Sequence, residues 1–324
     1  GLLIKFLQLC SYEPTMDSQF LSFASLSHSL YQLLFEPLKI IEQKVVICPD
    51  NFIIPFEALC IDDKGKNYLV NNYVFSYVYS ARYFLKKYNP YEAAGDFVGF
   101  APVSFKTFPG VADLKQSGNA LKQSAGYYNN TKLYTNKSAS RHNFINTVSR
   151  YTIVNIFSHA RADTTGNEPV LYLHDSVIYF SELQLLQNPA TKLAVLSACQ
   201  THAGKSATGE GIFSLARGFA LAGIPSVAAT LWQADEQTIY KISEKFHEFL
   251  SQGMAKDEAL QKAKLFFIKN SSSENPFPYY WANIVLVGNA EPITLSENHH
   301  ALWWIVTIIV ISIIILLVVK KRLA

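Results

Sequence analysis

The chain has 324 residues, a formal net charge of +3, and only 16% charged residues. This length suits one large domain or two small ones. The low and balanced charge argues against a nucleic-acid-binding surface, which needs a clustered basic face. The four cysteines show neither C-x-x-C spacing nor a dense framework, so we expect no zinc or other metal site, no disulfide scaffold and no cofactor.

The first 44 residues are expected to be mainly helical. Leucines recur at helical spacing from Leu26 to Leu34, and Pro37 then interrupts the pattern. No 34-residue period is visible, so any helical repeats would lie before Gly1. Turn residues and short apolar runs predict strands in the next segment, at 45–47, 52–54 and 68–79.

Strand and helix patterns then alternate, which is typical of a parallel sheet with right-handed crossovers. Phe97–Ala101 is the first predicted central strand. The turn Phe108-Pro109-Gly110 precedes a predicted helix carrying Val111, Leu114 and Leu121. The remaining expected elements, in chain order, are strands at 132–134 and 151–157, an edge strand at 171–173, strands at 193–196, 225–231 and 280–287, and helices at 139–148, 181–186 (with Ser181 as N-cap), 212–222, 236–250 and 256–268.

Two of these strands end beside chemically active side chains. Tyr151–Phe157 is followed within two residues by His159, and Leu193–Leu196 within three residues by Cys199. Runs of branched and aromatic residues are typical of strands buried on both faces. Because ligands bind beyond the carboxyl ends of parallel strands, the sequence predicts that His159 and Cys199 face each other across one crevice.

A cysteine and a histidine in that arrangement can transfer acyl groups. The imidazole takes the thiol proton and later returns it to a leaving amine. The backbone N–H groups of Ala160 and Cys199 are candidates for an oxyanion hole. On spacing alone the alternative stays open, in which Cys199 is a small buried hydrophobic residue and His159 a loop residue with satisfied hydrogen bonds. His202 is a weaker candidate base, because it lies in a loop.

A series of motifs resembles the CHAT peptidase family of caspase- and separase-like cysteine proteases. The motifs occur in the expected order: Phe157-Ser158-His159-Ala160-Arg161-Ala162-Asp163, Leu196-Ser197-Ala198-Cys199-Gln200-Thr201, Gly209-Glu210-Gly211, Leu215-Ala216-Arg217-Gly218-Phe219, Ala222-Gly223, Val227-Ala228-Ala229-Thr230-Leu231-Trp232 and Tyr280-Trp281-Ala282. The resemblance extends from Val45 to about Pro292. It implies that His159 is the general base, that Cys199 is the nucleophile, and that tetratricopeptide-type or regulatory domains precede the peptidase.

Residues 199–206 differ by one residue from a phosphate-binding loop. Cys199 stands in place of the first glycine, whose missing side chain lets the loop surround a phosphate. The following helix is expected to begin near Ile212, too far from Lys205 to hold that phosphate. We therefore rank nucleotide binding well below acyl transfer.

Two carboxylates are candidates for substrate selection. Asp235 follows the strand at 225–231, in a segment that helps to form the specificity pocket of caspase-like folds, and Asp163 lies beside the histidine. A carboxylate there would favour Lys or Arg before the cleaved bond. Asp235 is also suited to cap the helix at 236–250, and one residue can do both.

A membrane span is predicted near the carboxyl end. The eighteen residues from Leu302 to Val319 carry no charge, and a helix of them is ~27 Å long, enough for the hydrocarbon core. Trp303 and Trp304 fit the interface, and Lys320-Lys321-Arg322 follow at once. The positive-inside rule then places the peptidase outside the cytoplasm; the alternative is a tail anchor with a cytosolic peptidase.

Together these patterns predict a caspase-like three-layer αβα sandwich with a mostly parallel sheet and one C-terminal transmembrane helix. The expected parts are a helical segment at 1–44, a peptidase domain at 45–295 (entry subdomain 45–135, catalytic half 136–295), a linker at 296–301, the span at 302–319 and a basic tail at 320–324. The expected function is a membrane-anchored endopeptidase acting on protein or peptide substrates. The alternative is a catalytically silent scaffold that binds protein partners.

Overall fold

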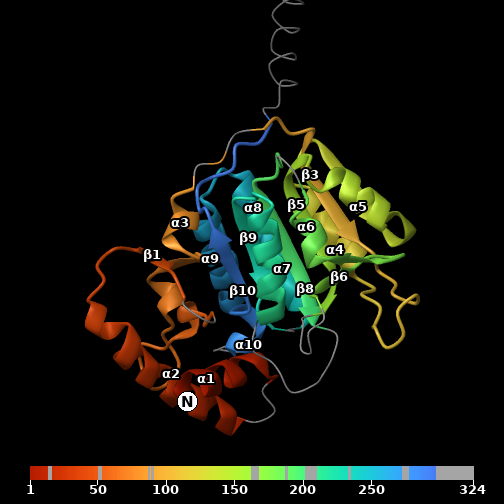
Figure 1. Ribbon diagram of the computed structural model, residues 1–324. Helices are drawn as coiled ribbons and strands as arrows, with labels where there is room; N and C mark the ends of the chain where they lie inside the picture. Colours follow the sequence, from red (N-terminus) through yellow and green to blue (C-terminus); the bar gives the residue numbers. More distant parts are fainter. Residues whose placement is uncertain are drawn as a thin grey trace, which may run out of the picture. The chain divides into compact units, whose positions relative to one another are not determined.

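Strands and helices alternate along the part of the chain that the computed structural model describes (Figure 1). That part comprises residues 1–13, 17–49, 53–86, 88, 91–161, 168–186, 189–200, 210–232, 235–271 and 277–296, with only the backbone for 17–18, 198–200 and 210–214. The strands are β1 Lys44–Ile47, β2 Val74–Tyr77, β3 Gly95–Ala101, β4 Thr131–Thr135, β5 Tyr151–Arg161, β6 Val170–Tyr172, β7 Val177–Tyr179, β8 Leu193–Gln200, β9 Ser226–Thr230 and β10 Ile284–Gly288. The α-helices are α1 Leu2–Ser11, α2 Asp17–Leu34, α3 Ala81–Phe84, α4 Ser117–Ala125, α5 Arg141–Thr147, α6 Phe180–Leu183, α7 Glu210–Leu221, α8 Glu236–Ser251, α9 Lys256–Lys269 and α10 Pro278–Trp281. Short 3₁₀ turns are η1 Glu36–Leu38, η2 Phe56–Ala58, η3 Leu69–Asn71 and η4 Asn136–Ser138.

The strands form one mostly parallel sheet. Its order is β1-β2-β10-β9-β8-β5-β3-β4, and β6 and β7 extend it as an antiparallel hairpin on β5. Along the main order only β10 and β9 pair antiparallel. The central strands β5 and β8 are therefore parallel and adjacent, so their carboxyl ends lie at the same edge of the sheet (Figure 1).

Helices cover both faces of this sheet. On one face Phe157 of β5 packs edge-on against Tyr240 of α8, and the Cα of Gly99 lies close against Leu121 of α4. On the other face Phe100 of β3 packs against Phe144 of α5, within an apolar cluster that includes residues of α7. The predicted three-layer αβα arrangement with a mostly parallel sheet is thus confirmed.

Both strands of the predicted crevice are longer than their apolar runs suggest. β5 continues to Arg161 and β8 to Gln200, so His159 and Cys199 lie inside the strands. The extension of β5 is explained by the hairpin, because Ala160 and Arg161 pair with β6. Polar residues at a strand end predict the start of a loop, but tertiary pairing keeps these residues in the sheet.

Some predicted elements differ from the structure. Ile53 and Ile54 are buried without forming a strand, and the strand expected at 68–79 is shortened to β2 by the η3 turn. The predicted final strand is divided into α10 and β10. Helix α6 begins at Phe180 with Tyr179 at its N-cap, so the capping role predicted for Ser181 is wrong. Burial of apolar side chains alone did not determine secondary structure in these short segments.

The N-terminal region is mainly helical within the described residues, as predicted. Helix α2 buries Phe23, Ala24 and Leu30, whereas Leu33 is 64% exposed. The ring of Phe23 packs against Phe277, which lies just before α10. Helix α2 is thereby tied to the segment just before α10 through aromatic contacts.

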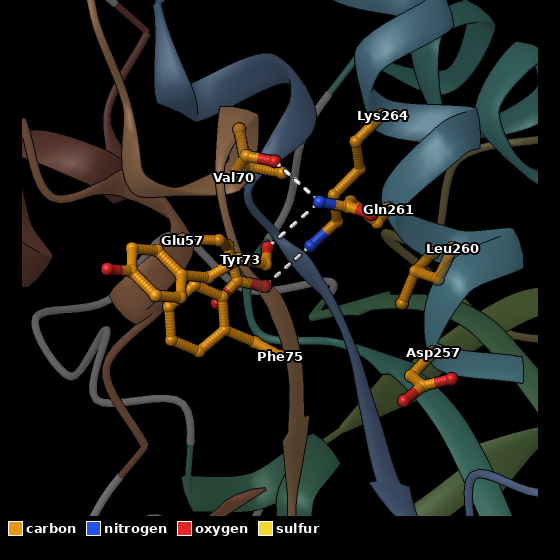
Figure 2. Close-up of a pocket in the computed structure, with 8 residues that line it drawn as sticks. All are labelled: Glu57, Val70, Tyr73, Phe75, Asp257, Leu260, Gln261 and Lys264. Carbon is orange, nitrogen blue, oxygen red and sulfur yellow. Dashed lines mark hydrogen bonds and ion pairs between the residues drawn. The ribbon is translucent and has the colours of Figure 1, made fainter. Parts of the chain in front are cut away.

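A buried ion pair also ties α9 to the region before β2. Lys264 Nζ lies 2.6 Å from Glu57 Oε1, with both side chains almost completely buried, and Tyr77 donates its hydroxyl to the other oxygen of Glu57. Figure 2 shows this pair beside Gln261, whose side-chain amide donates to the carbonyls of Val70 and Tyr73. The space between these groups is comparable to a single water, so we assign no ligand to it.

His247 on α8 faces the core of the fold. Its side chain is fully buried, shares a hydrogen bond with the Tyr128 hydroxyl at Nδ1 (2.9 Å) and packs against Phe97. Burial lowers the pKa of His247 to about 3, so its imidazole is neutral at pH 7. It is a core residue.

The described residues from Gly1 to Thr294 form one compact unit. The predicted span at 302–319 lies outside the described residues and stays a prediction, as do the predicted domain bounds. Among the helices that the structure describes, none has the length and apolar character needed to cross a bilayer.

We predict that Lys264→Met destabilises the protein by about 3–5 kcal/mol, because it leaves the Glu57 carboxylate buried without its cation. Adding Glu57→Gln should recover most of this loss, since a neutral amide is cheaper to bury and still accepts from Tyr77. Urea unfolding measures both. Lys245→Met is the matched control, because its partner Glu248 is a partly exposed neighbour on α8, and it should cost about 0.5 kcal/mol or less. A double variant as unstable as the single one would contradict this account.

Candidate active site

His159 and Cys199 occupy paired positions on neighbouring strands. The β5–β8 ladder runs in register from Ile153 with Leu193 to Ala160 with Gln200, and within it His159 is the direct partner of Cys199. Paired positions on parallel strands belong to the same face of a sheet, because residues alternate between faces with period two. The backbones of His159 and Cys199 are therefore adjacent, as predicted. For Cys199 the structure describes the backbone alone.

The His159 imidazole is held from two sides. The residue is 6% exposed, and Nε2 lies 2.8 Å from the carbonyl oxygen of Ala112. The ring of Phe105 packs edge-to-face against it, with centroids 4.7 Å apart. Both neighbours belong to the irregular segment 102–116, between β3 and α4, which we call the histidine loop.

This contact assigns the proton on the ring. A carbonyl oxygen can only accept a hydrogen bond, so Nε2 must carry the hydrogen and donate it to Ala112. In the neutral ring Nδ1 is then the basic nitrogen. Nδ1 is buried and has no hydrogen-bond partner among the described residues. A buried basic nitrogen without a partner is the atom expected of a general base that waits for a proton donor.

Burial lowers the pKa of the His159 imidazole below that of an ordinary histidine, and the hydrogen bond to the Ala112 carbonyl opposes this effect. Burial is the larger cause. At neutral pH the ring is therefore the free base, the form that can accept a proton.

The sequence pattern does not indicate that the histidine loop belongs to the site. The turn at Phe108-Pro109-Gly110 predicts a helix that carries Val111 and Leu114, but α4 begins only at Ser117. The extra loop packs an apolar cluster against the hairpin β6–β7. Topology was the available signal, because a loop leaving the carboxyl end of β3 must lie beside the end of its neighbour β5.

Asp235 lies after β9, at the same sheet edge, and caps α8. Its Oδ2 accepts hydrogen bonds from the backbone N–H (2.9 Å) and the hydroxyl (3.1 Å) of Thr238. The residue is exposed. The capping role predicted for Asp235 is confirmed, and its role in a specificity pocket stays a prediction.

The other candidate residues differ in how far the structure describes them. Ala160 is buried in β5 and pairs with Gln200 of β8 on one side and Leu171 of β6 on the other. Asp163 and His202 lie outside the described residues. No group of three or more His, Cys, Asp or Glu side chains that could hold a metal ion occurs in the described ranges.

Solved structures of gingipain R share this architecture. The crystal structure of the Arg-specific cysteine proteinase gingipain R matches with a TM-score of 0.52 and 10% identity, over 87% of this chain and 69% of that one. The complex of the pro- and mature domains of RgpB from Porphyromonas gingivalis matches with a TM-score of 0.51, 9% identity, and coverages of 87% and 70%. The Saccharomyces cerevisiae separase–securin complex matches with a TM-score of 0.48 and 15% identity, over 74% of this chain and 15% of that one. A search of curated proteins gives no match.

At such low identity the likeness to gingipain R shows a shared fold and nothing finer. The family model is more specific, because the model of the CHAT domain matches residues 24–289, which is most of the chain and contains both strands of the candidate site. The chain belongs to the CHAT domain family.

Proposed function

We propose that the protein is a cysteine endopeptidase that uses Cys199 as nucleophile and His159 as general base. The observation that carries this proposal is the pairing of the two residues on β5 and β8, at the carboxyl edge of the sheet. Membership of the CHAT domain family, whose relatives by fold include cysteine proteinases, supports it.

The proposed reaction follows from the state of the imidazole. Nδ1 of His159 takes the thiol proton of Cys199, and the thiolate attacks the carbonyl carbon of the scissile peptide bond. When the tetrahedral intermediate collapses, the imidazolium returns the proton to the leaving amine, and a thioester remains. Water, deprotonated by the same nitrogen, then releases the carboxylic acid product and restores the thiol. The Nε2 donation to Ala112 persists through the cycle, since that nitrogen keeps its hydrogen in both forms of the ring.

The developing oxyanion requires backbone donors. The N–H groups of Ala160 and Cys199 remain our candidates because they lie next to the dyad in β5 and β8.

For substrates we propose proteins or peptides with Lys or Arg before the cleaved bond. Asp235 supports this, because it is an exposed carboxylate at the carboxyl edge of the sheet that uses Oδ2 for its helix cap. Asp163 is the second candidate. Gingipain R, which shares the fold, is named as Arg-specific.

The proposal also includes the setting of the enzyme. The apolar segment 302–319 and the three cations after it favour a single-pass anchor with the peptidase outside the cytoplasm, or a tail anchor with the peptidase in the cytosol. Upstream tetratricopeptide-type or regulatory domains are proposed partners of the peptidase in the same polypeptide. The rival proposal is a silent scaffold that keeps the fold without cleaving.

We predict that Cys199→Ala lowers peptide cleavage by a factor of about 10⁴ or more, because no other group supplies the nucleophile. Cys48→Ala is the matched control. Cys48 is an exposed free cysteine just after the edge strand β1, whereas β5 and β8 lie in the middle of the sheet. This variant should keep full activity. The assay is hydrolysis of a peptide library, combined with labelling by an electrophilic peptide. Cleavage that survives in Cys199→Ala would contradict the proposal, and a wild-type chain that neither cleaves nor is labelled would favour the scaffold.

We predict that His159 binds its proton at a pH below the ~6.5 of an ordinary histidine. Its pKa is lowered by burial, so the free base persists as the pH falls through 6.5 and is lost only below that value. NMR titration of ring-labelled histidine measures this, with His159→Gln to assign the signal. A midpoint at or above 6.5 would show that the ring is not buried as described.

We predict that Asp235→Asn keeps the stability of the protein but weakens its preference for Lys and Arg, whereas Asp235→Ala loses both. Asparagine still caps α8 without a charge, and alanine removes a cap worth about 1 kcal/mol. Thermal unfolding reports the cap, and library cleavage reports the preference. If Asp235→Asn cleaves after Lys and Arg as selectively as the wild type does, Asp235 is a cap only.

A further inference from the structure

We propose that Asp113 is a positioning residue for His159. It holds together two arms of the histidine loop, one that contains Ser104 and Phe105 and one that contains Ala112 and Asp113. The expected effect of Asp113 on catalysis rests on the proposed function. Its effect on the position of the imidazole does not. Asp113 does not touch the ring. It acts through Phe105 and Ala112, the two residues that do.

The carboxylate of Asp113 joins the two arms directly. Its Oδ1 accepts hydrogen bonds from the backbone N–H of Phe105 (2.9 Å) and from the hydroxyl of Ser104 (3.0 Å). Asp113 itself follows Ala112 in the chain. One oxygen atom thus links the arm that carries the packing ring to the arm that carries the accepting carbonyl.

The arm that Asp113 holds is conformationally strained. Val103 has φ of +65°, in the left-handed region that β-branched residues rarely adopt. The N–H of Ser104 donates to the carbonyl of Pro102 across it (2.7 Å), and the N–H of Leu114 donates to the carbonyl of Val103 (2.8 Å). Such a conformation costs about 1–3 kcal/mol and persists only where its surroundings hold it. Removing the Asp113 contacts should therefore let this arm relax.

Relaxation would reach the imidazole on both sides. The Phe105 ring lies 4.7 Å from the His159 ring, and the Ala112 carbonyl lies 2.8 Å from Nε2. A displacement of the Ala112 carbonyl by about 1 Å is enough to lose a hydrogen bond of this length, and a displacement of Phe105 weakens the ring contact. Since the Ala112 bond decides which nitrogen carries the hydrogen, its loss would leave Nδ1 less well directed as the base.

The charge of Asp113 is present over the whole neutral range. The hydrogen bond from the Phe105 N–H, followed by that from Ser104, lowers the pKa of the Asp113 carboxyl. Both bonds need an acceptor rather than a negative charge. Asparagine can supply the same oxygen, and alanine cannot.

The test measures hydrogen exchange of the His159 Nε2–H by NMR in the full chain, with ring-labelled histidine. In the wild type this hydrogen is bonded to the Ala112 carbonyl, in a residue that is 6% exposed, so its exchange with water is slow. We expect Asp113→Ala to speed exchange tenfold or more and Asp113→Asn to change it less than about threefold. Ser104→Ala removes one of the two bonds to Asp113, so its exchange rate should lie between those of the two Asp113 variants. It replaces Asp113→Ala in the test if that variant does not fold.

Asp62→Ala is the matched control. Asp62 also orders a loop with its carboxylate, through the backbone N–H groups of Lys64, Lys66 and Asn67, but in the region of β2, at the opposite end of the sheet from β3. It should leave the exchange of the His159 hydrogen unchanged. If hydrogen exchange at His159 is accelerated equally in Asp62→Ala and Asp113→Ala, the cause is a general loss of stability and the proposal is overturned. It is also overturned if Asp113→Ala does not accelerate the exchange.

Peptide cleavage is the second measurement. We expect Asp113→Ala to lower kcat about tenfold or more with KM within about threefold, and Asp113→Asn to restore most of kcat. A loss carried mainly by KM would overturn the positioning role. If exchange responds as expected while the wild-type chain cleaves nothing, the proposed protease function fails and the structural role of Asp113 stands.

Discussion

The register of β5 against β8 is the constraint on which the candidate site depends. A slip of one residue would place His159 opposite Ala198 or Gln200 and move every following side chain to the other face. The described residues of both strands are largely buried, with apolar side chains packed against α8 on one face and α7 on the other. A slip would therefore disrupt two cores at once, so the packing that stabilises the fold also fixes the neighbours of His159.

The sheet and the histidine loop make different contributions. The sheet sets the position of the His159 backbone, because β5 is paired along its whole length. It does not set the orientation of the ring or the nitrogen that carries the hydrogen. These follow from Phe105 and the Ala112 carbonyl, which belong to a loop without regular structure. A rigid frame with an irregular but well-bonded loop is a common way to hold a reactive side chain.

Buried polar groups are treated differently in different parts of the fold. The Glu57–Lys264 pair satisfies each of its charges and links α9 to the segment before β2. His247 is kept neutral by burial and packs as an aromatic residue of the core. His159 is also buried, and each of the two imidazoles keeps one nitrogen without a partner among the described residues, Nε2 in His247 and Nδ1 in His159. An unsatisfied buried nitrogen is costly for stability in either residue. What distinguishes His159 is its position opposite Cys199 on the neighbouring strand.

The sequence by itself determined the alternation of strands and helices, the parallel sheet, the capping role of Asp235 and the choice of His159 and Cys199, because each depends on local pattern or on motif. Only the tertiary structure decided that these two residues lie inside paired strands, that His247 is a core residue, and that Ala112 and Phe105 hold the imidazole. The physical reason is that these contacts join segments about 40 to 150 residues apart. Local propensity carries no information about which loop meets which strand end, and a backbone carbonyl such as that of Ala112 leaves no side-chain signature in the sequence at all.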